Sequence, residues 1–366
     1  IAVVIKKKVM LFSILFISVS LFAQSRINSN YNQAYRQAKN YYAQSEYGKA
    51  MKSAEDAIRF KKETIENEVR KIENSLSSKD VKKAQGKISD IIPILREREE
   101  IDCIEIINYY MNKMGAEYFH NSIYNLIAHI KTQIEFPEAQ KLLGDIYKIE
   151  GEYTLAESYY RKALNNFEVL DVPDEKYEIL YVMADLSRLT GDNEKMELRL
   201  LNITSKENFD RRNMLLKSAL NLISRGQENC VDKLFELYRY DDYYSLKAYC
   251  LLSDYYESVG ETQKALSYSA LAAITGFTKM DEVIKKRNLV YEYTNLNDFL
   301  IEVSHYSDLV EWGTDNNIWK SFNNLYRLSN NLGYKKFSID LLKVLAKNSP
   351  EPYYQNTAVL ELSKIK

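Results

Sequence analysis

Residues 137–163 read PEAQKLLGDIYKIEGEYTLAESYYRKA, and the placement of small and large side chains in this stretch indicates the fold. Small residues at Gly144 and Ala156 allow two antiparallel helices to cross closely, and the bulky Tyr147 and Tyr160 fill the spaces between neighbouring helices. A chain that turns sharply after a helix favours glycine, because glycine adopts a left-handed conformation without a Cβ penalty. Gly151 is therefore expected to end the first helix.

This stretch resembles the tetratricopeptide repeat (TPR), a helix–turn–helix unit of about 34 residues. The matching positions are Leu143, Gly144, Tyr147, Gly151, Tyr153, Ala156, Tyr160 and Ala163. The turn glycine recurs at Gly191, Gly226, Gly260 and Gly333, at spacings of 40, 35, 34 and 73 residues. Further matches to the repeat are Ala265 and the unit-ending Pro350, and residues 31–57 fit with Ser45 replacing the turn glycine.

The resemblance implies an all-α protein, a TPR-type α-solenoid in which antiparallel helix pairs form a superhelix. Another kind of α-solenoid is the alternative. Glycine (11) and proline (5) are scarce, which also favours helices, because a β-rich chain of 366 residues needs more turn residues. We expect a first TPR-like helix pair over 24–57 and an array over 137–366, with units near 137–170, 177–210, 212–245, 246–279, 281–314 and 319–352.

The repeat fades over residues 58–136, which carry many charges. Ile65, Val69, Ile72 and Leu76 follow one another by four, three and four residues, which predicts a long amphipathic helix extending from the first repeat. Ile88, Ile91, Ile92 and Leu95 suggest a second apolar stripe, bent by Pro93. The segment is either two divergent repeats with solvated charged faces or a projecting helical hairpin that dimerises or docks.

The N-terminal segment has the features of a secretory signal peptide. Lys6, Lys7 and Lys8 precede an uncharged, largely apolar run from Val9 to Ala23, which is shorter than the roughly 20 residues of a spanning helix. We expect residues 1–23 to be a signal peptide and the protein to be exported to a bacterial periplasm or cell envelope. An uncleaved membrane anchor and a buried helix are the alternatives.

The sequence offers no site for chemistry. It contains no HExxH, GxSxG, phosphate-loop or GxGxxG motif, and its three cysteines form no CxxC pair. We therefore expect no enzyme activity, no cofactor and no metal. The charges nearly balance, with 50 basic and 51 acidic residues, which gives no overall field for nucleic acid.

A binding function remains. In the repeats that this chain resembles, the first helix of each unit lines a concave groove. Helix periodicity then places these residues in the groove: Tyr35, Lys39, Tyr42, Lys141, Asp145, Lys148, Tyr181, Asp185, Arg188, Asp254, Glu257 and Arg327. Mixed charge with tyrosine suits the capture of a peptide or a helix, whereas an ordinary solvated face is the alternative for any one residue.

Two functions fit this surface. The first is a non-enzymatic protein–protein interaction scaffold of the cell envelope. The second is an extracytoplasmic sensor or regulator whose groove binds a peptide or glycan. The combination of signal sequence, repeats and helical segment is similar to that of envelope-assembly and cell-wall coordination factors, and membrane contact is expected only through the signal segment if it is not cleaved.

Overall fold

The computed structural model describes residues 30–205, 209–237 and 243–365, and these are helical, with one isolated antiparallel bridge between Lys87 and Ser122. The all-α prediction is confirmed for this part of the chain. The chain divides into two compact units, 1–179 and 180–366. The expected signal peptide, residues 1–23, lies outside the described residues.

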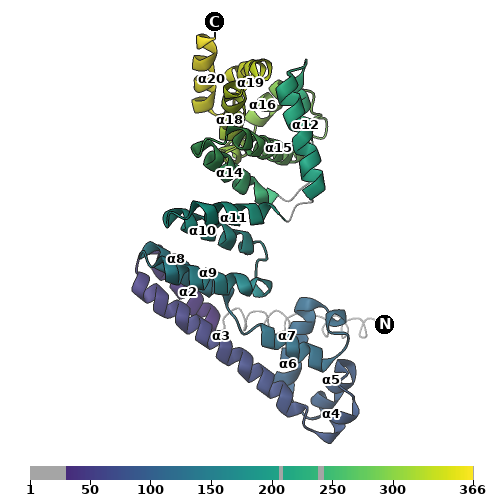
Figure 1. The fold of residues 1–366 in the computed structure, drawn as a ribbon. Coiled ribbons are helices and arrows are strands. Elements are labelled where there is room, and N and C mark those ends of the chain that lie inside the picture. The colour runs from purple at the N-terminus through teal and green to yellow at the C-terminus, as the bar shows by residue number, and fades with distance from the viewer. Residues whose placement is uncertain (1–29, 206–208, 238–242, 366) are drawn as a thin grey trace, which may run out of the picture. The chain divides into compact units, whose positions relative to one another are not determined.

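Unit 1 contains two helix pairs, and the two helices of each pair follow one another in the sequence (Figure 1). Helix α2 (Asn30–Ala43) packs on α3 (Tyr47–Ser75), and α8 (Pro137–Ile149) packs on α9 (Tyr153–Asn165). Helix α8 also contacts α2 and α3, so the two pairs stack directly on one another although residues 76–136 lie between them in the sequence. A short 3₁₀ helix, Phe167–Val169, follows α9, and α10 (Glu175–Leu189) begins at the end of the unit.

Small residues permit the close packing of α8 on α9. A Cβ added at Gly144 would lie 2.6 Å from a ring atom of Tyr160, so that only glycine accommodates the ring without a shift. Ala156, Tyr160 and Ala163 on α9 are fully buried, as is Leu143 on α8. Gly144, Ala156 and Tyr160 therefore lie in the close contact between α8 and α9.

Helix α3 continues far beyond the first pair, as the stripe of isoleucine and valine predicts. Its second half forms a separate hydrophobic core with α4 (Lys79–Lys83), α5 (Ile88–Glu97), α6 (Ile101–Met114) and α7 (Ile123–Thr132). A 3₁₀ turn, Ala116–Phe119, contributes the buried Phe119. Ile65, Val69 and Ile72 are buried in this core from α3, and Ile88, Ile91 and Leu95 from α5, which contains Pro93. We call α4–α7 and the second half of α3 the inserted subdomain.

In unit 2, α11 (Asn193–Thr204), α12 (Phe209–Arg225) and α13 (Cys230–Phe235) precede a 3₁₀ turn at Tyr243–Ser245 and the pair α14 (Leu246–Ser258) and α15 (Thr262–Arg287). Then follow α16 (Leu296–Ser304), α17 (Ser307–Asp315), α18 (Ile318–Asn331), α19 (Lys335–Asn348) and α20 (Pro352–Lys364). Helix α19 ends two residues before Pro350.

Helix α15 is the centre of unit 2. It packs extensively on α14 and on α18, and it is buried on nearly all sides between Ala265 and Ile284. Gly276 lies against Ile318, whose side chain would be 2.2 Å from an added Cβ, so glycine allows α18 to approach closely. The start of the expected unit near 281–314 belongs to the end of α15, and α16 and α17, which follow in it, make fewer contacts with α15 than α18 does.

The turn residues adopt one backbone conformation. Gly151, Gly191, Gly226, Gly260 and Gly333 all have positive φ, between 54° and 82°, and Ser45 has φ of 60°. After five of these six residues, the next N–H donates to the carbonyl five residues earlier, at 2.8–2.9 Å: Glu46 to Tyr41, Glu152 to Tyr147, Asp192 to Ser187, Glu261 to Tyr256 and Tyr334 to Ser329. The turn at Gly226 lacks this hydrogen bond and leads into the six-residue helix α13.

Candidate partner-binding surface

The predicted groove residues of unit 1 lie on α2 and α8, whose helices are in contact. Lys39 is exposed, with its Nζ 4.9 Å from the centroid of the Tyr35 ring. Tyr35 and Tyr42 are half-buried, and the Tyr35 ring packs on that of Phe136 with centroids 5.0 Å apart. Lys148 is half-buried on α8. This face therefore combines one exposed lysine and one half-buried lysine with partly accessible aromatic rings.

Asp145 connects this face to the interior. Its Oδ1 accepts a 2.7 Å hydrogen bond from the Tyr160 hydroxyl, and its Oδ2 accepts one of 3.1 Å from Lys141 Nζ. Lys141 also lies 3.9 Å from Glu178. Burial, and then the charge of Asp145, raises the pKa of Tyr42. Asp145 thus positions Tyr160 as well as facing the predicted groove.

A buried polar cluster beside Tyr35 was not found from the sequence. Glu138, in the first turn of α8, is only 7% exposed, and its Oε1 accepts a 2.7 Å hydrogen bond from the Asp171 N–H. Its Oε2 has no hydrogen-bond partner among the described residues. Lys61 Nζ lies 4.5 Å from the centroid of the Phe136 ring.

Burial governs the electrostatics of this cluster. It raises the pKa of Glu138, which the hydrogen bond from Asp171 and the charge of Lys61 oppose, and it lowers the pKa of Lys61. Burial, and then the charges of Glu138 and Glu175, also raises the pKa of Tyr35. The sequence signal was weak, because a glutamate in the first turn of a helix is common on exposed surfaces.

On α10, Tyr181 serves as an internal connector within unit 2. Its hydroxyl donates to the carbonyl of Tyr244 and accepts a 3.0 Å hydrogen bond from the N–H of Ala248. Asp185 and Arg188 form a 2.7 Å ion pair three residues apart on the same helix. The structure therefore places Tyr181 in the packing next to α14 and leaves Arg188 exposed.

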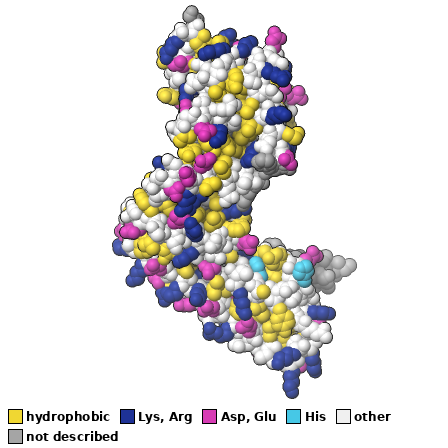
Figure 2. Space-filling view, in the orientation of Figure 1, with side chains coloured by type: hydrophobic (Ala, Val, Ile, Leu, Met, Phe, Trp, Pro, Cys, Tyr) yellow, Lys and Arg dark blue, Asp and Glu magenta, His cyan; other side chains and the backbone are white. Residues whose placement is uncertain are grey.

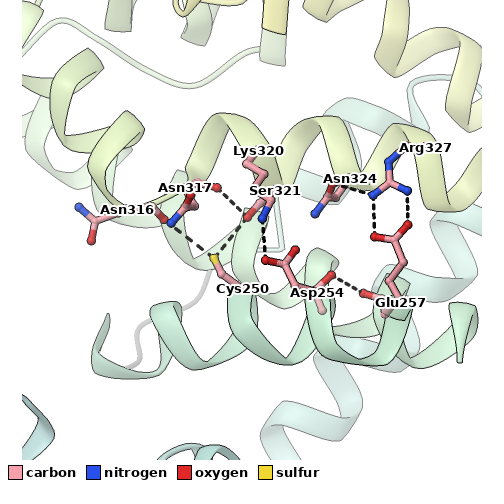
Figure 3. Close-up of polar contacts among 11 residues, drawn as sticks. Cys250, Asp254, Glu257, Asn316, Asn317, Lys320, Ser321, Asn324 and Arg327 are labelled. Carbon is pink, nitrogen blue, oxygen red and sulfur yellow. Dashed lines mark hydrogen bonds and ion pairs between the residues drawn. The ribbon is translucent and has the colours of Figure 1, made fainter. Parts of the chain in front are cut away.

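The predicted groove residues of α14, Asp254 and Glu257, form ion pairs with basic side chains of α18 (Figure 3). Asp254 accepts a 2.6 Å hydrogen bond from Lys320, and Glu257 faces the Arg327 guanidinium, with its Oε2 2.6 Å from Nη2. Arg327 also donates to Asn324 at 3.1 Å. The Arg327 hydrogen bond lowers the pKa of Glu257, so this carboxylate stays ionised. The ion pairs join two helices that are far apart in sequence.

Sequence reasoning named Asp254, Glu257 and Arg327 but missed Lys320. Lys320 lies seven residues before Arg327, which is about two helical turns, so both side chains lie on one face of α18. This periodicity could have identified it. The pairing of these side chains with Asp254 and Glu257 could not be found, because nothing in the sequence states that α14 and α18 are neighbours.

The cysteines, the groups that could hold a metal ion and the candidate membrane-spanning helices were also inspected in the structure's described residues. All three cysteines are buried thiols, and Cys250 Sγ lies 3.5 Å from Ser321 Oγ, with burial raising its pKa to about 11. Within 30–205, 209–237 and 243–365, no group of three or more His, Cys, Asp or Glu side chains is placed to hold a metal ion. Over the same residues, none of the helices has the length and apolar character needed to cross a membrane.

The chain is similar to two spirochete proteins. It is 28% identical over 324 residues to an uncharacterised protein of Treponema pallidum, covering 88% of this chain and 87% of that protein. It is 24% identical over 245 residues to an uncharacterised protein of Borreliella burgdorferi, covering 60% of this chain and 75% of the relative. No protein-family model matches the sequence. The protein is thus a homologue of an uncharacterised spirochete protein, and the names of these relatives do not state a function.

Proposed function

We propose that this protein is a non-enzymatic scaffold of the cell envelope, which binds other proteins through the surfaces of a TPR-type helical array. Export is part of the proposal and depends on the signal-like segment over residues 1–23. The ligand-binding sensor is the competing proposal, and the experiment below separates the two.

The observation that best supports a TPR-type array is the repeated turn. In five turns between consecutive helices, a residue of positive φ is followed by a 2.8–2.9 Å hydrogen bond that spans five residues. The same local geometry fixes the angle at which the second helix leaves the first. Repeated helix pairs with a repeated turn are typical of arrays that present long binding surfaces, which favours a scaffold over an enzyme.

The face of α2 and α8 in unit 1 is the best candidate for the partner contact. Lys39 is exposed, and Tyr35 and Tyr42 keep part of their rings accessible. In unit 2 the corresponding charges of α14 and α18 are occupied by the Asp254–Lys320 and Glu257–Arg327 pairs. A partner that used those charges of unit 2 would first have to break these pairs, which costs free energy.

The test is to crosslink intact cells of the native host that express the full chain with a C-terminal tag, and to identify the recovered proteins by mass spectrometry. A scaffold is recovered with envelope proteins at fixed stoichiometry. A chain recovered alone, whose thermal stability increases when peptides or glycans are added, refutes the scaffold and supports the sensor. A chain recovered with cytoplasmic proteins refutes export.

Charge reversal tests the proposed surface. The variant Lys39→Glu/Lys148→Glu should reduce recovery of the partner by about tenfold, because opposite charge is replaced by like charge at the contact. Lys52→Glu is the matched control, since Lys52 is an exposed lysine on α3. Asp145 is left unchanged, because its bond to Tyr160 would confuse a loss of binding with a loss of stability. Equal recovery with both variants would place the contact elsewhere.

A further inference from the structure

Glu138, in the first turn of α8, is a buried carboxylate with one unused oxygen. Only 7% of the residue is exposed. Its Oε1 accepts the hydrogen bond from the Asp171 N–H, whereas its Oε2 has no hydrogen-bond partner among the described residues. A buried acceptor without a donor costs free energy, because burial has removed its hydration. A donor that reaches Oε2 would recover this cost.

Other polar groups beside Glu138 are also unused. Tyr35 on α2 and Glu175 at the start of α10 are both half-buried, and burial, followed by the charge of Glu138, raises the pKa of each. Over the residues that the structure describes, no hydrogen bond involves the Tyr35 hydroxyl or the Glu175 carboxylate. Convergent polar groups that do not bind one another are typical of a ligand site. We call Tyr35, Lys61, Phe136, Glu138 and Glu175 the Glu138 cluster.

The Glu138 cluster already attracts cations from this chain. Lys61 Nζ lies 4.5 Å from the centroid of the Phe136 ring, and Lys39 Nζ lies 4.9 Å from that of Tyr35. Lys61 forms no ion pair with Glu138 within the described part of the chain. The face of an aromatic ring attracts positive charge. After burial, the charges that raise the pKa of Tyr35 are those of four carboxylates, Glu138, Glu175, Asp145 and Asp171. Rings and acidic charge together favour a cationic ligand.

We propose that the Glu138 cluster binds an arginine side chain of the partner protein. The guanidinium replaces the Lys61 ammonium on the Phe136 ring and donates hydrogen bonds to Glu138 Oε2 and to the Glu175 carboxylate. Lys61 has a flexible four-carbon chain and moves toward solvent to admit it. This inference rests on the proposed function, because Tyr35 belongs to the same surface of α2 and α8, and it adds the chemistry of the partner.

Arginine fits the Glu138 cluster better than lysine does. Its planar guanidinium stacks on aromatic rings and carries several donors in a fixed fork, so one group can serve two carboxylates. An ammonium is a compact charge that is more strongly hydrated. Hydrophobic side chains lie among acidic and basic ones over the surface of unit 1 (Figure 2), which suits the apolar stem of an arginine as well as its charged end.

The first test titrates N-acetyl-arginine methylamide into the full chain, purified as its host cell processes it, at pH 8. Saturation-transfer difference NMR measures the Kd, which should be on the order of 1 mM for a single side chain. The matched control probe is N-acetyl-citrulline methylamide, which has a similar shape and no charge and should bind at least tenfold more weakly. Equal binding of the two probes, or binding of neither, would overturn the proposal.

Glu138→Gln tests the carboxylate. Glutamine keeps the size of the side chain and an acceptor for the Asp171 N–H, but it removes the charge, so the Kd of the arginine probe should rise about tenfold. Glu150→Gln is the matched control, because Glu150 is an exposed glutamate directly after α8, and its Kd should equal that of the wild type. The same Kd in both variants would contradict a role of Glu138 in binding.

Lys61→Met tests the displacement of Lys61. Methionine keeps an unbranched chain but removes the ammonium that competes for the Phe136 ring, so the Kd of the arginine probe should fall about threefold. A gain in affinity cannot come from a variant that fails to fold. A Kd that is unchanged or higher would refute the exchange of the two cations on the ring.

Crosslinking in the native host connects the Glu138 cluster to the partner. Glu138→Gln should reduce recovery of the partner about tenfold and Glu150→Gln should not, and far-UV circular dichroism verifies that both variants keep their helices. Equal recovery with the two variants would overturn the assignment of the partner's arginine to this cluster. The probe measurements require no partner, so a failure of the Glu138 cluster and a failure of the scaffold function are distinguishable.

Discussion

Replacing Gly144 by alanine tests whether close helix contact accounts for the packing of α8 on α9. The new Cβ would lie 2.6 and 2.7 Å from two ring atoms of Tyr160. Tyr160 cannot move aside easily, because it is fully buried and its hydroxyl donates a 2.7 Å hydrogen bond to Asp145. Overpacking a core costs about 1–3 kcal/mol, and this constrained ring should place the cost in the upper part of that range.

Alanine also favours the helix by about 1 kcal/mol relative to glycine, so the net loss of stability should be about 1–2 kcal/mol. Urea unfolding followed by far-UV circular dichroism measures it as a lower midpoint. Gly48→Ala in α3 is the control, because nothing lies within 4 Å of a Cβ there, and this variant should be as stable as the wild type or slightly more stable.

The effect of Gly144→Ala should depend on the ring of Tyr160, and a second background tests this. When Tyr160→Leu removes the ring, Gly144→Ala should change sign and stabilise the protein by about 1 kcal/mol, because only the helix preference remains. An unchanged loss of stability in that background would show that the glycine is required for another reason. A wild-type background that gains stability from Gly144→Ala would show that Tyr160 is not tightly confined.

Three further predictions concern unit 2. Glu257→Gln should cost about 1 kcal/mol or less at neutral pH, because the pair with Arg327 is partly exposed. The Arg327 hydrogen bond lowers the pKa of Glu257 below its ordinary 4.5. The stabilisation by the ion pair is therefore complete above pH 4.5 and is lost as the pH falls through the lowered pKa. Urea unfolding curves of the wild type and of Glu257→Gln should accordingly converge in acid. Gly333→Ala should destabilise the protein by about 1 kcal/mol, because alanine is strained at a φ of 82°. A steric clash does not contribute, since no atom lies within 4 Å of the added Cβ. Urea unfolding measures the loss of stability, and equal stability of variant and wild type would exclude that strain. Cys250 should resist alkylation until the protein unfolds, because burial raises its pKa to about 11, and rapid labelling of the native thiol would contradict its placement against Ser321.

Local features of the fold could be predicted from the sequence. The apolar stripe of Ile65, Val69 and Ile72 predicts the second half of α3, because helix periodicity is a local property. The turn glycines are likewise local, since a residue with positive φ favours glycine whatever surrounds it.

Features that depend on contacts between distant segments could not be predicted. The direct stacking of α8 on α3 depends on residues 76–136 folding as a separate body, and the sequence left this open between stacked repeats and a projecting hairpin. The length of α15 is another example, because the helix is buried on nearly all sides and carries no single apolar stripe. Among the groove residues, the pairing of Glu257 with Arg327 depends on α18 packing next to α14.

Helix α3 belongs to two bodies at once, and this has a mechanical consequence. Its 29 residues span about 43 Å, with Ala50 and Ala54 packed in the first helix pair and Ile65 to Ile72 packed in the inserted subdomain. No proline interrupts it, and its one glycine, Gly48, lies in its first turn. Helix α3 therefore acts as a stiff rod that transmits a force on the inserted subdomain to the helices that pack on α8, and a force on that helix pair to the inserted subdomain.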